Sequence, residues 1–433
     1  MAVDGTLKIA FYGDDFTGAT DTLATAARAG LRTMLFLGLP GDAHLKEAGA
    51  LDCLGIAGAA RAMSPAEMQV ELMPVGEFFA SLKVPVTHYK TCSTFDSAPH
   101  IGSIGAAIRL LQPYAGNTFV PILGGQPNLR RYCVFSHLFA AAGDGIYRID
   151  RHPTMRRHPV TPMAEADLRL HLQQQGLRRV DAVHCPDYGR PAPQLDQQLE
   201  ALLAQQPDAV LFDVAQVSDL AVVGRLVWQR ALQQRLLAVG ASSVVQALAA
   251  HWGGGSAANE AKMGPAEGPV LMLAGSLSPM TARQVQAAVS YDKVLLDASQ
   301  LAQDSGYRSR MAGQIAAQLG QGRHVMVCTS TREVSASLSL NGRVLAQAGG
   351  DLLAQVLHLT PVKRLGIAGG DTSSHAVQAL DAWGLSYMAQ LAPGVALCRL
   401  HSDVASLDGM ELMLKGGQVG GEQLFEELLS GNH

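Results

Sequence analysis

The sequence predicts an α/β fold made of two α/β domains with mostly parallel sheets. Short apolar runs rich in β-branched residues alternate with longer helical patterns, which is typical of parallel strands joined by right-handed crossover helices. A chain of 433 residues is also longer than a typical single hydrophobic core. Finally, residues 251–268 mix glycine, small polar residues and proline without a hydrophobic period, and the alternation begins again after them.

We therefore expect a first domain over residues 1–250, a linker over 251–268 and a second domain over 269–433. The strands expected in the first domain are 9–12, 32–37, 53–57, 86–90, 118–123, 182–185 and 209–214. The helices expected there are 19–29, 101–111, 165–175, 195–205 and 221–239. The strands expected in the second domain are 270–274, 294–296, 325–328, 365–368, 395–400 and 411–414.

The composition narrows the class of protein. Hydrophobic residues make up 48% of the chain and charged residues 16%, which fits a globular enzyme with buried sheets. The formal net charge of −4 gives no electrostatic reason to expect a nucleic-acid partner. Without a long apolar run or a signal-peptide pattern, we expect a cytoplasmic protein and no membrane partner. The six cysteines form no Cys-x-x-Cys pair and no histidine falls in a zinc-ligand spacing, so we expect reduced thiols and no structural zinc.

The first stretch that carries chemistry is 8–21, KIAFYGDDFTGATD. A buried strand ends at Gly13, which turns the chain so that Asp14 and Asp15 stand at the carboxyl end of the strand, where open parallel sheets bind ligands. Thr17 or Thr20 is expected to cap the helix that follows. The glycine spacing resembles a phosphate-binding P-loop, but the lysine of that loop is absent and two acids would repel a phosphate.

The acid pair has two interpretations. It can hold hydroxyl groups or a cation, with one aspartate as a general base. Alternatively, it is a capped turn in which the acids favour the positive end of a helix dipole.

A second polar stretch, 88–102, follows another predicted strand. Lys90, Thr91, Cys92 and Ser93 offer an ammonium, hydroxyls, a thiol and backbone amides, which suit a small polyhydroxy acid whose carboxylate pairs with the lysine. Arg61 is a candidate for a second, bidentate contact with that carboxylate. The alternatives are an ordinary polar loop and a solvated arginine. A cationic loop at 148–163 either lines an anion site or forms a rigid surface excursion, because its prolines exclude a regular helix.

The second half has glycine-bearing loops after three predicted strands. Glycines let the backbone approach a phosphate closely, and a helix that begins directly after them directs free amides and a positive dipole at it. Tight turns explain most single Gly-Gly pairs, but three such loops in one domain favour a nucleotide site. The loops comprise Gly275 and Ser276, then Gly369, Gly370, Asp371 and Thr372, and finally Gly416 and Gly417.

The two halves thus divide the chemistry, with hydroxyl-binding groups in the first and anion-binding loops in the second. This division predicts an active site in the interdomain cleft, with a nucleotide on one side and a small alcohol on the other. Such an arrangement is typical of a kinase.

With these motifs in place, the sequence resembles the four-carbon acid sugar kinase family, whose members phosphorylate threonate, erythronate or their oxo-derivatives with ATP. The matching motifs span nearly the whole chain in the same order. They are DDFTGATD at 14–21, KTCSTFDS at 90–97, HPVTPM at 158–163, Gly275-Ser276, GGDTS at 369–373 and KGG at 415–417. The resemblance implies that residues 1–250 bind the acid sugar and residues 269–433 bind ATP.

The resemblance also implies roles for individual residues. ATP and Mg²⁺ are the implied cofactors, and of the two acids Asp15 is preferred over Asp14 as the proton acceptor. The implied sugar-acid contacts are Asp14, Asp15, Arg61, Lys90, Thr91, Cys92 and Ser93. The implied nucleotide contacts are Ser276, Gly369, Gly370, Asp371, Thr372 and Gly416.

Three departures from the family pattern bear on the substrate and on the ATP contact. Part of the family has Lys-Thr-Asp-Ser-Thr where this chain has KTCST at 90–94. Residues 124–131 read GGQPNLRR, where other members differ. The segment at 416–420 matches the usual glycine motif of the family less closely. The sequence leaves open which acid and which hydroxyl react, the Mg²⁺ ligands and whether the chain forms a homo-oligomer.

Two other functions were weighed. An NAD-dependent dehydrogenase of a small hydroxy acid also suits two α/β domains, but no strand end carries the expected Gly-x-Gly-x-x-Gly pattern. A non-catalytic sugar-acid sensor would bind its ligand without releasing ADP.

Overall fold

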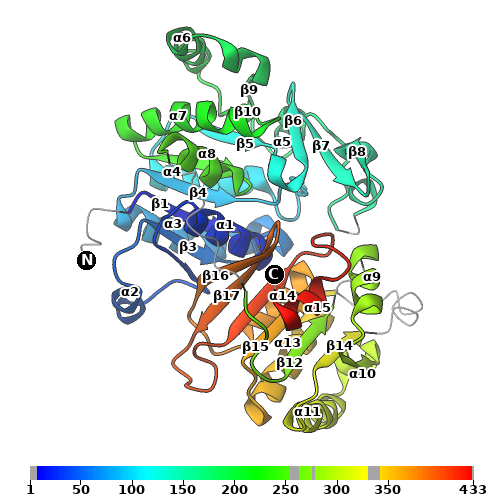
Figure 1. Cartoon of the computed structure of the whole chain (residues 1–433). Helices are drawn as coiled ribbons and strands as arrows, with labels where there is room; N and C mark the ends of the chain where they lie inside the picture. Colours follow the sequence, from blue (N-terminus) through cyan, green and yellow to red (C-terminus); the bar gives the residue numbers. More distant parts are fainter. Residues whose placement is uncertain (1–6, 159, 254–262, 276–277, 330–341, 432–433) are drawn as a thin grey trace. The chain divides into compact units, whose positions relative to one another are not determined.

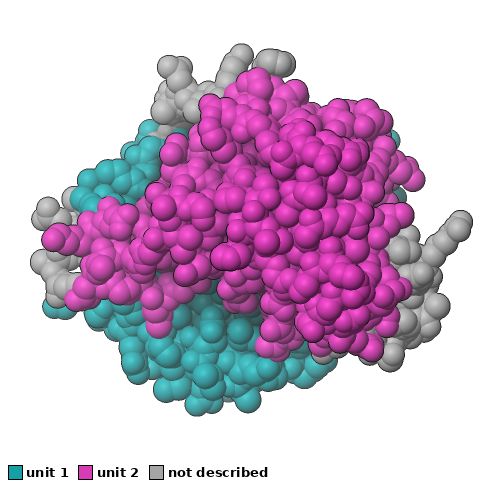
Figure 2. All heavy atoms as spheres, turned by 90° about the horizontal axis from the view of Figure 1, so that it is seen from below, with its two compact units in different colours: residues 1–33, 48–258 teal, residues 34–47, 259–433 magenta. Residues whose placement is uncertain are grey.

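The computed structural model describes residues 7–158, 160–253, 263–275, 278–329 and 342–431 (Figure 1). The chain divides into two compact units, which Figure 2 shows in different colours. Unit 1 comprises residues 1–33 and 48–258, and unit 2 comprises residues 34–47 and 259–433. Both are α/β, as predicted. The finer domain limits at 250 and 268 stay a prediction, and much of the expected linker, 254–262, lies outside the described residues.

Unit 1 is built on a parallel sheet with the strand order β3-β1-β4-β11-β5-β10-β9. Every neighbouring pair in this order is parallel. The register aligns Gly13 with Lys90 and Lys90 with Gly240, so these strands end at one edge. The strands are β1 (Ile9–Gly13), β3 (Cys53–Ala57), β4 (Val86–Lys90), β5 (Val120–Gly124), β9 (Val180–Val183), β10 (Ala209–Asp213) and β11 (Leu236–Gly240).

The helices of unit 1 follow the strands along the chain. They are α1 (Phe16–Arg28), α3 (Pro65–Leu82), α4 (Ile104–Ala115), α5 (Leu168–Gln173), α6 (Ala192–Leu203), α7 (Val217–Gln233) and α8 (Ser243–His251). Helix α1 buries Phe16, Ala19 and Leu23, which lie on one face at helical spacing. Its N-cap is Asp15 rather than the predicted Thr17 or Thr20, because the Asp15 carboxylate accepts a hydrogen bond from the Gly18 amide.

One predicted helix, 221–239, is wrong in its second half. Helix α7 ends at Gln233, and the apolar run from Leu236 to Gly240 is the central strand β11. A strand buried on both faces shows no alternation, so its sequence does not differ from that of a buried helix segment.

A second, three-stranded antiparallel sheet in unit 1 was not predicted. It consists of β6 (Arg131–Val134), β7 (His137–Ala142) and β8 (Gly145–Arg148). The cationic loop that follows contains only the short 3₁₀ turns Ile149–Arg151 and Met155–Arg157 among its described residues, in agreement with its prolines. Arg148 pairs there with Asp150 at 2.5 Å.

Unit 2 is built on a sheet with the order β13-β14-β12-β15-β18-β17-β16-β2. The first five strands are parallel, and the last three pair antiparallel with their neighbours. The strands are β2 (Thr33–Phe36), β12 (Val270–Ala274), β13 (Asp292–Leu296), β14 (Val325–Thr329), β15 (Arg364–Ala368), β16 (Gly384–Ala392), β17 (Val395–His401) and β18 (Glu411–Lys415). The helices are α2 (Asp42–Ala48), α9 (Pro279–Ala287), α10 (Ala298–Gln303), α11 (Ser305–Gly320), α13 (Gly342–Leu359), α14 (Gly370–Gln378) and α15 (Leu424–Ser430).

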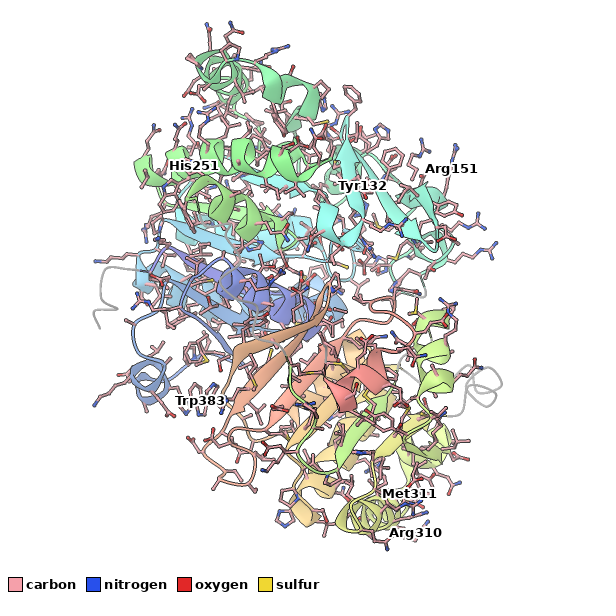
Figure 3. All side chains as sticks on the ribbon, in the orientation of Figure 1. Tyr132, Arg151, His251, Arg310, Met311 and Trp383 are labelled. Carbon is pink, nitrogen blue, oxygen red and sulfur yellow. The ribbon has the colours of Figure 1, made fainter. Side chains whose placement is uncertain are left out.

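Residues 34–47 belong to unit 2 although they precede most of unit 1 in sequence. Strand β2 pairs with β16, with Phe36 opposite Gly384. Trp383, labelled in Figure 3, stacks on His44 with ring centroids 4.8 Å apart and lies 6.0 Å from the ring of Phe36. Strand pairing and aromatic contacts together hold this segment in unit 2. No helix within the described ranges is long and apolar enough to cross a membrane.

Candidate functional site

The acid pair follows β1 at the carboxyl edge of the unit 1 sheet. Asp14 and Asp15 are buried, with 4% and 6% of their surface exposed. The Asp14 amide donates to the Lys90 carbonyl at 3.0 Å, which ties the turn to the neighbouring strand. Gly13 is required for the turn, because a Cβ atom there would lie 2.6 Å from the Cβ of Ala19 in α1. The first turn of α1 therefore packs directly against the end of the strand.

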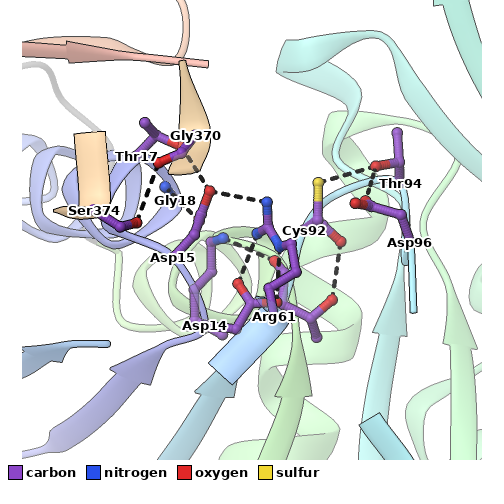
Figure 4. Close-up of polar contacts among 12 residues, drawn as sticks. Asp14, Asp15, Thr17, Gly18, Arg61, Cys92, Thr94, Asp96, Gly370 and Ser374 are labelled. Carbon is purple, nitrogen blue, oxygen red and sulfur yellow. Dashed lines mark hydrogen bonds and ion pairs between the residues drawn. The ribbon is translucent and has the colours of Figure 1, made fainter. Parts of the chain in front are cut away.

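Arg61 joins the two acids. It lies in a 3₁₀ turn after β3, and its amide donates to the Asp14 carbonyl at 3.1 Å. Its guanidinium contacts both oxygens of Asp14, with Nη2 to Oδ1 at 2.7 Å and Nε to Oδ2 at 3.2 Å (Figure 4). Its Nη1 donates to Asp15 Oδ2 at 2.9 Å. The protein's own carboxylates thus accept hydrogen bonds from all three nitrogens of the Arg61 guanidinium.

The surroundings shift the pKa values of the two acids in opposite directions. Burial raises the pKa of Asp14 above its ordinary value, in spite of the neighbouring Arg61. Burial acts in the same direction on Asp15, but Arg61, Lys90 and hydrogen bonds from Thr17 and Gly18 outweigh it and lower the pKa of Asp15. Of the two, Asp14 therefore has the stronger affinity for a proton.

Lys90 and the residues after it lie at the same sheet edge. The Lys90 side chain is buried and its Nζ donates to the Thr91 carbonyl at 2.8 Å. A Cβ atom on Gly18 would lie 2.2 Å from that Nζ and 2.5 Å from Asp15 Oδ1, so the lysine and the aspartate both pack against the first turn of α1. Only glycine leaves room for this packing. The ammonium of Lys90 thereby completes a cluster of two cations and two acids.

Cys92 contacts Thr94 and, through it, Asp96, two residues of the same polar stretch that were not expected to act together. Its sulfur lies 2.9 Å from the Thr94 hydroxyl, which donates to Asp96 at 2.5 Å. Burial raises the pKa of the Cys92 thiol to about 11, so this side chain is a neutral thiol at pH 7. Ser93 is half-buried beside it. Thr94 and Asp96 lie within the KTCSTFDS motif, and that motif was the available signal.

In unit 2, strands β12, β15 and β18 end side by side, since Ala274 aligns with Ala368 and Ala368 with Lys415. Gly369 has φ = 128°, a conformation that side-chain-bearing residues avoid, and α14 begins directly after it at Gly370. The Gly370 carbonyl accepts a hydrogen bond from Ser374 at 3.1 Å (Figure 4). The free amides at the start of α14 therefore lie at the carboxyl edge of this sheet.

The other predicted residues of this edge lie close by. A Cβ atom on Gly275 would come within 2.4 Å of the Thr372 hydroxyl, so the loops after β12 and β15 are in contact. Gly416 follows directly on β18. Ser276 lies outside the described residues, and the Asp371 side chain is not described.

Lys415 connects the glycine loop after β18 to α9. This role was not expected from the sequence. Its fully buried Nζ donates to Thr281 Oγ1 at 3.0 Å, to Gln284 Oε1 at 2.6 Å and to the Gly417 carbonyl at 3.4 Å. Burial lowers the pKa of Lys415 to about 7. The sequence signal for this role of Lys415 is that a lysine stands at the end of a buried strand, β18.

Comparison with known proteins agrees with this division. Residues 9–248 match the family described as a sugar-binding N-terminal domain, and residues 271–425 match the nucleotide-binding C-terminal domain. A 3-oxo-isoapionate kinase of Paraburkholderia graminis is 37% identical over 97% of this chain and 93% of its own length. A 3-oxo-tetronate kinase of Methylobacterium radiotolerans is 30% identical over 98% of this chain and 99% of its own. A 3-oxo-tetronate kinase of Cupriavidus necator is 29% identical over 96% of this chain and 95% of its own length.

Two solved structures share the fold. A protein of Salmonella typhimurium LT2 superposes with a TM-score of 0.77 at 22% identity, covering 98% of both chains. A Haemophilus influenzae protein of the DUF1537 family superposes with a TM-score of 0.69 at 24% identity, covering 97% of this chain and 98% of its own.

A sugar-binding domain followed by a nucleotide-binding domain, together with close relatives that are kinases, defines the class of protein as a phosphotransferase. The chain belongs to the four-carbon acid sugar kinase family, as its motifs predicted.

Proposed function

We propose that this chain is an ATP-dependent kinase that phosphorylates a hydroxyl group of an acid sugar of the 3-oxo-tetronate or 3-oxo-isoapionate kind. The relatives that match over nearly their whole length carry these two names. The observation that carries the proposal is the buried cluster of Asp14, Asp15 and Arg61 at the carboxyl edge of the sugar-binding unit. Buried acids held in fixed positions suit the binding and deprotonation of an alcohol.

Of the two acids, we assign Asp14 as the proton acceptor, in place of the Asp15 expected from the sequence, because its pKa is raised. A general base works best when its pKa lies closer to the working pH, and the pKa of Asp14 is raised. Asp15 is committed to the local structure, since its carboxylate caps α1 and accepts from Thr17 at 2.7 Å. In this assignment Asp14 accepts the hydroxyl proton, while Asp15 and Arg61 hold it in place. Thr91, Cys92 and Ser93 would contact the sugar acid.

The nucleotide would bind at the carboxyl edge of the unit 2 sheet. The proposed contacts are Ser276, Gly369, Gly370, Asp371, Thr372 and Gly416. The amides at the start of α14 and the glycine loop after Lys415 suit phosphate oxygens, because Gly369, Gly370 and Gly416 carry no side chain that would keep the backbone from a phosphate. The terminal phosphoryl group has to reach the hydroxyl held beside Asp14 for transfer to occur.

Magnesium fits this arrangement as an ion brought in with ATP. Within the described part of the chain, no three His, Cys, Asp or Glu side chains are grouped so as to hold a metal. Mg²⁺ in kinases is commonly held by substrate phosphates and one or two carboxylates, so a protein cage is not needed. When bound, the ion would neutralise charge on the phosphates, and the chain's own residues would position the acceptor.

A coupled ADP-release assay tests the proposal, with ATP, Mg²⁺ and a panel of threonate, erythronate, 3-oxo-tetronate and 3-oxo-isoapionate. We expect turnover with at least one of these acids, and loss of most of it in Asp14→Asn. Ligand binding without ADP release would support a sensor instead. Reduction of NAD with a hydroxy acid would support a dehydrogenase.

We also propose that the enzyme works in the cytoplasm. The six cysteines are free thiols, as expected for a reducing compartment. Size-exclusion chromatography with light scattering would establish whether a homo-oligomer forms.

A further inference from the structure

Arg131, the first residue of β6, has a cationic side chain to which the described residues offer no anionic partner. Its Nη1 donates to the Leu129 carbonyl, while its Nε is buried and has no hydrogen-bond partner. No carboxylate of the described residues lies within ion-pair distance of it, whereas Arg61 holds two. An unmatched guanidinium in a partly buried position is a group that an external anion would stabilise.

The fold brings Arg131 to the edge of the sheet that carries the acid pair. Its backbone pairs with Gln126, just beyond the end of β5, with hydrogen bonds of 2.8 and 3.2 Å. The Gln126 side chain donates to Asp21 of α1 at 3.1 Å. Strand β5 lies three strands from β1, the strand that leads to Asp14, since the order along the sheet is β1-β4-β11-β5. Three strand spacings amount to about 14 Å, which a small acid sugar spans together with the side chains of Arg131 and Asp14.

The charged residues around the acid pair indicate which ligand Arg131 binds. Lys90 and Arg61 balance Asp14 and Asp15, so that cluster carries two positive and two negative charges. Burial lowers the pKa of Arg131. The guanidinium still stays charged at neutral pH, since arginine does not lose its proton there. Asp96, the buried acid that accepts a hydrogen bond from Thr94, adds one negative charge near Cys92, and Arg131 adds one positive charge that no carboxylate of the described residues pairs with.

We propose that Arg131 binds the carboxylate of the acid sugar, and that Arg61 instead holds the catalytic acids in position. This inference rests on the proposed function and deepens it. An arginine matches a carboxylate with two parallel hydrogen bonds, and Arg131 has its Nε and Nη2 unused by the described residues. With the carboxylate at Arg131, the hydroxyl end of the substrate extends toward Asp14. The enzyme would then select acids over neutral polyols of the same length.

The test compares Arg131→Gln with Arg130→Gln. Arg130 is the neighbouring residue and is exposed, and its Nη1 donates to the Gly143 carbonyl, so its replacement removes the same charge outside the site. We expect Arg131→Gln to raise KM for the acid sugar roughly 10- to 100-fold with a smaller change in kcat, since charge-assisted hydrogen bonds carry about that much. Arg130→Gln should leave KM within about twofold, a change typical of surface substitutions.

A second readout separates binding from folding. Calorimetric titration with the best acid of the panel, and with the corresponding polyol that lacks the carboxylate, should show a preference for the acid in the wild type that Arg131→Gln loses. Arg131→Lys keeps the charge but not the two parallel donors, so it should restore part of the affinity. Circular dichroism and thermal melting verify that each variant is folded.

The outcomes distinguish this inference from the proposed function. A KM for the acid sugar that is unchanged in a folded and active Arg131→Gln variant would overturn the inference and leave the kinase assignment intact. Binding of the acid that depends on Arg131, without ADP release, would uphold the inference and overturn the kinase assignment. A wild type that neither binds nor phosphorylates any acid of the panel would overturn both.

Discussion

Arg61 donates two parallel hydrogen bonds, of 2.7 and 3.2 Å, to Asp14, although the two residues are 47 positions apart in the sequence. A third bond reaches Asp15 at 2.9 Å. Both carboxylates are almost fully buried, so the guanidinium supplies the charge that allows them to remain ionised away from water. The acids therefore depend on one side chain both for their position and for their ionisation.

The first prediction concerns this dependence. Replacing Arg61 with Gln leaves two buried carboxylates with Lys90 as their one remaining cation of the cluster, and we expect a loss of about 3 kcal/mol in the free energy of unfolding. Urea unfolding followed by circular dichroism measures it. Arg32→Gln is the matched control, because Arg32 makes a similar bidentate pair with Asp52 at an exposed site and should cost less than about 1 kcal/mol. Equal losses in both variants would contradict the role of burial.

The second prediction separates the two acids. Asp14→Asn should lower kcat roughly 10²- to 10⁴-fold, which is the range of general-base catalysis. In the wild type, kcat/KM should fall as the pH drops through the raised pKa of Asp14, since the base must be ionised to accept a proton. Steady-state ADP release between pH 4.5 and 8 measures both effects.

Asp15→Asn is the comparison for that experiment. Asn caps helices about as well as Asp, so the main effect should come from the lost ion pair with Arg61 and appear in the free energy of unfolding, with a smaller effect on kcat. Asp167→Asn is the matched control, because Asp167 is the N-cap of α5 and loses its ion pair with Arg169 in the same way. If Asp15→Asn abolishes turnover and Asp14→Asn does not, then Asp15 is the base.

The third prediction concerns the buried Lys415. Its pKa falls to about 7 in the folded chain from an ordinary value of 10.5, so between these two values the unfolded chain binds more protons than the folded one. Stability should therefore rise with pH across this window. Thermal melting at pH 7, 8 and 9 measures the slope.

Replacing Lys415 with Met should flatten that slope. Lys363→Met is the control, since the pKa of the exposed Lys363 is raised by its hydrogen bond to Glu267 and it does not titrate in this window. An unchanged slope in the Lys415→Met variant would contradict the assignment.

The fourth prediction concerns the backbone of the nucleotide loop. Gly369→Ala forces a side chain into φ = 128°, which should cost about 1–3 kcal/mol and weaken the thermal shift caused by ATP. Gly349→Ala is the opposite control, because that residue lies inside α13 and the new Cβ atom would make an ordinary 3.6 Å contact with Leu273. There we expect a gain of about 0.5–1 kcal/mol and an unchanged ATP shift.

The fold was largely predictable from the sequence, because most strands are short apolar runs that end at glycine or at polar residues. The predicted ranges for β3, β4 and β12 coincide with the observed strands. The errors lie where periodicity carries no information. Strand β11 is buried on both faces and was joined to α7, and the hairpin strands β6, β7 and β16 have mixed, partly exposed patterns.

The candidate site was predictable in its residues but not in its contacts. Asp14 and Lys90 were found because parallel strands place their ends at one edge. That Arg61 is taken up by the acids, and that Arg131 is left unmatched, depends on side-chain geometry between distant segments. No local pattern in the sequence encodes such long-range pairing.

The place of β2 has a consequence for synthesis on the ribosome. Its partner β16 is translated much later, since Phe36 and Gly384 are 384 − 36 = 348 residues apart. At 5–20 residues per second the delay is roughly 20 to 70 s. During that time the apolar run Met34-Leu35-Phe36 has no β16 to pair with, and such an edge is prone to aggregation. For the same reason, a fragment that begins at residue 259 would lack strand β2, the antiparallel neighbour of β16.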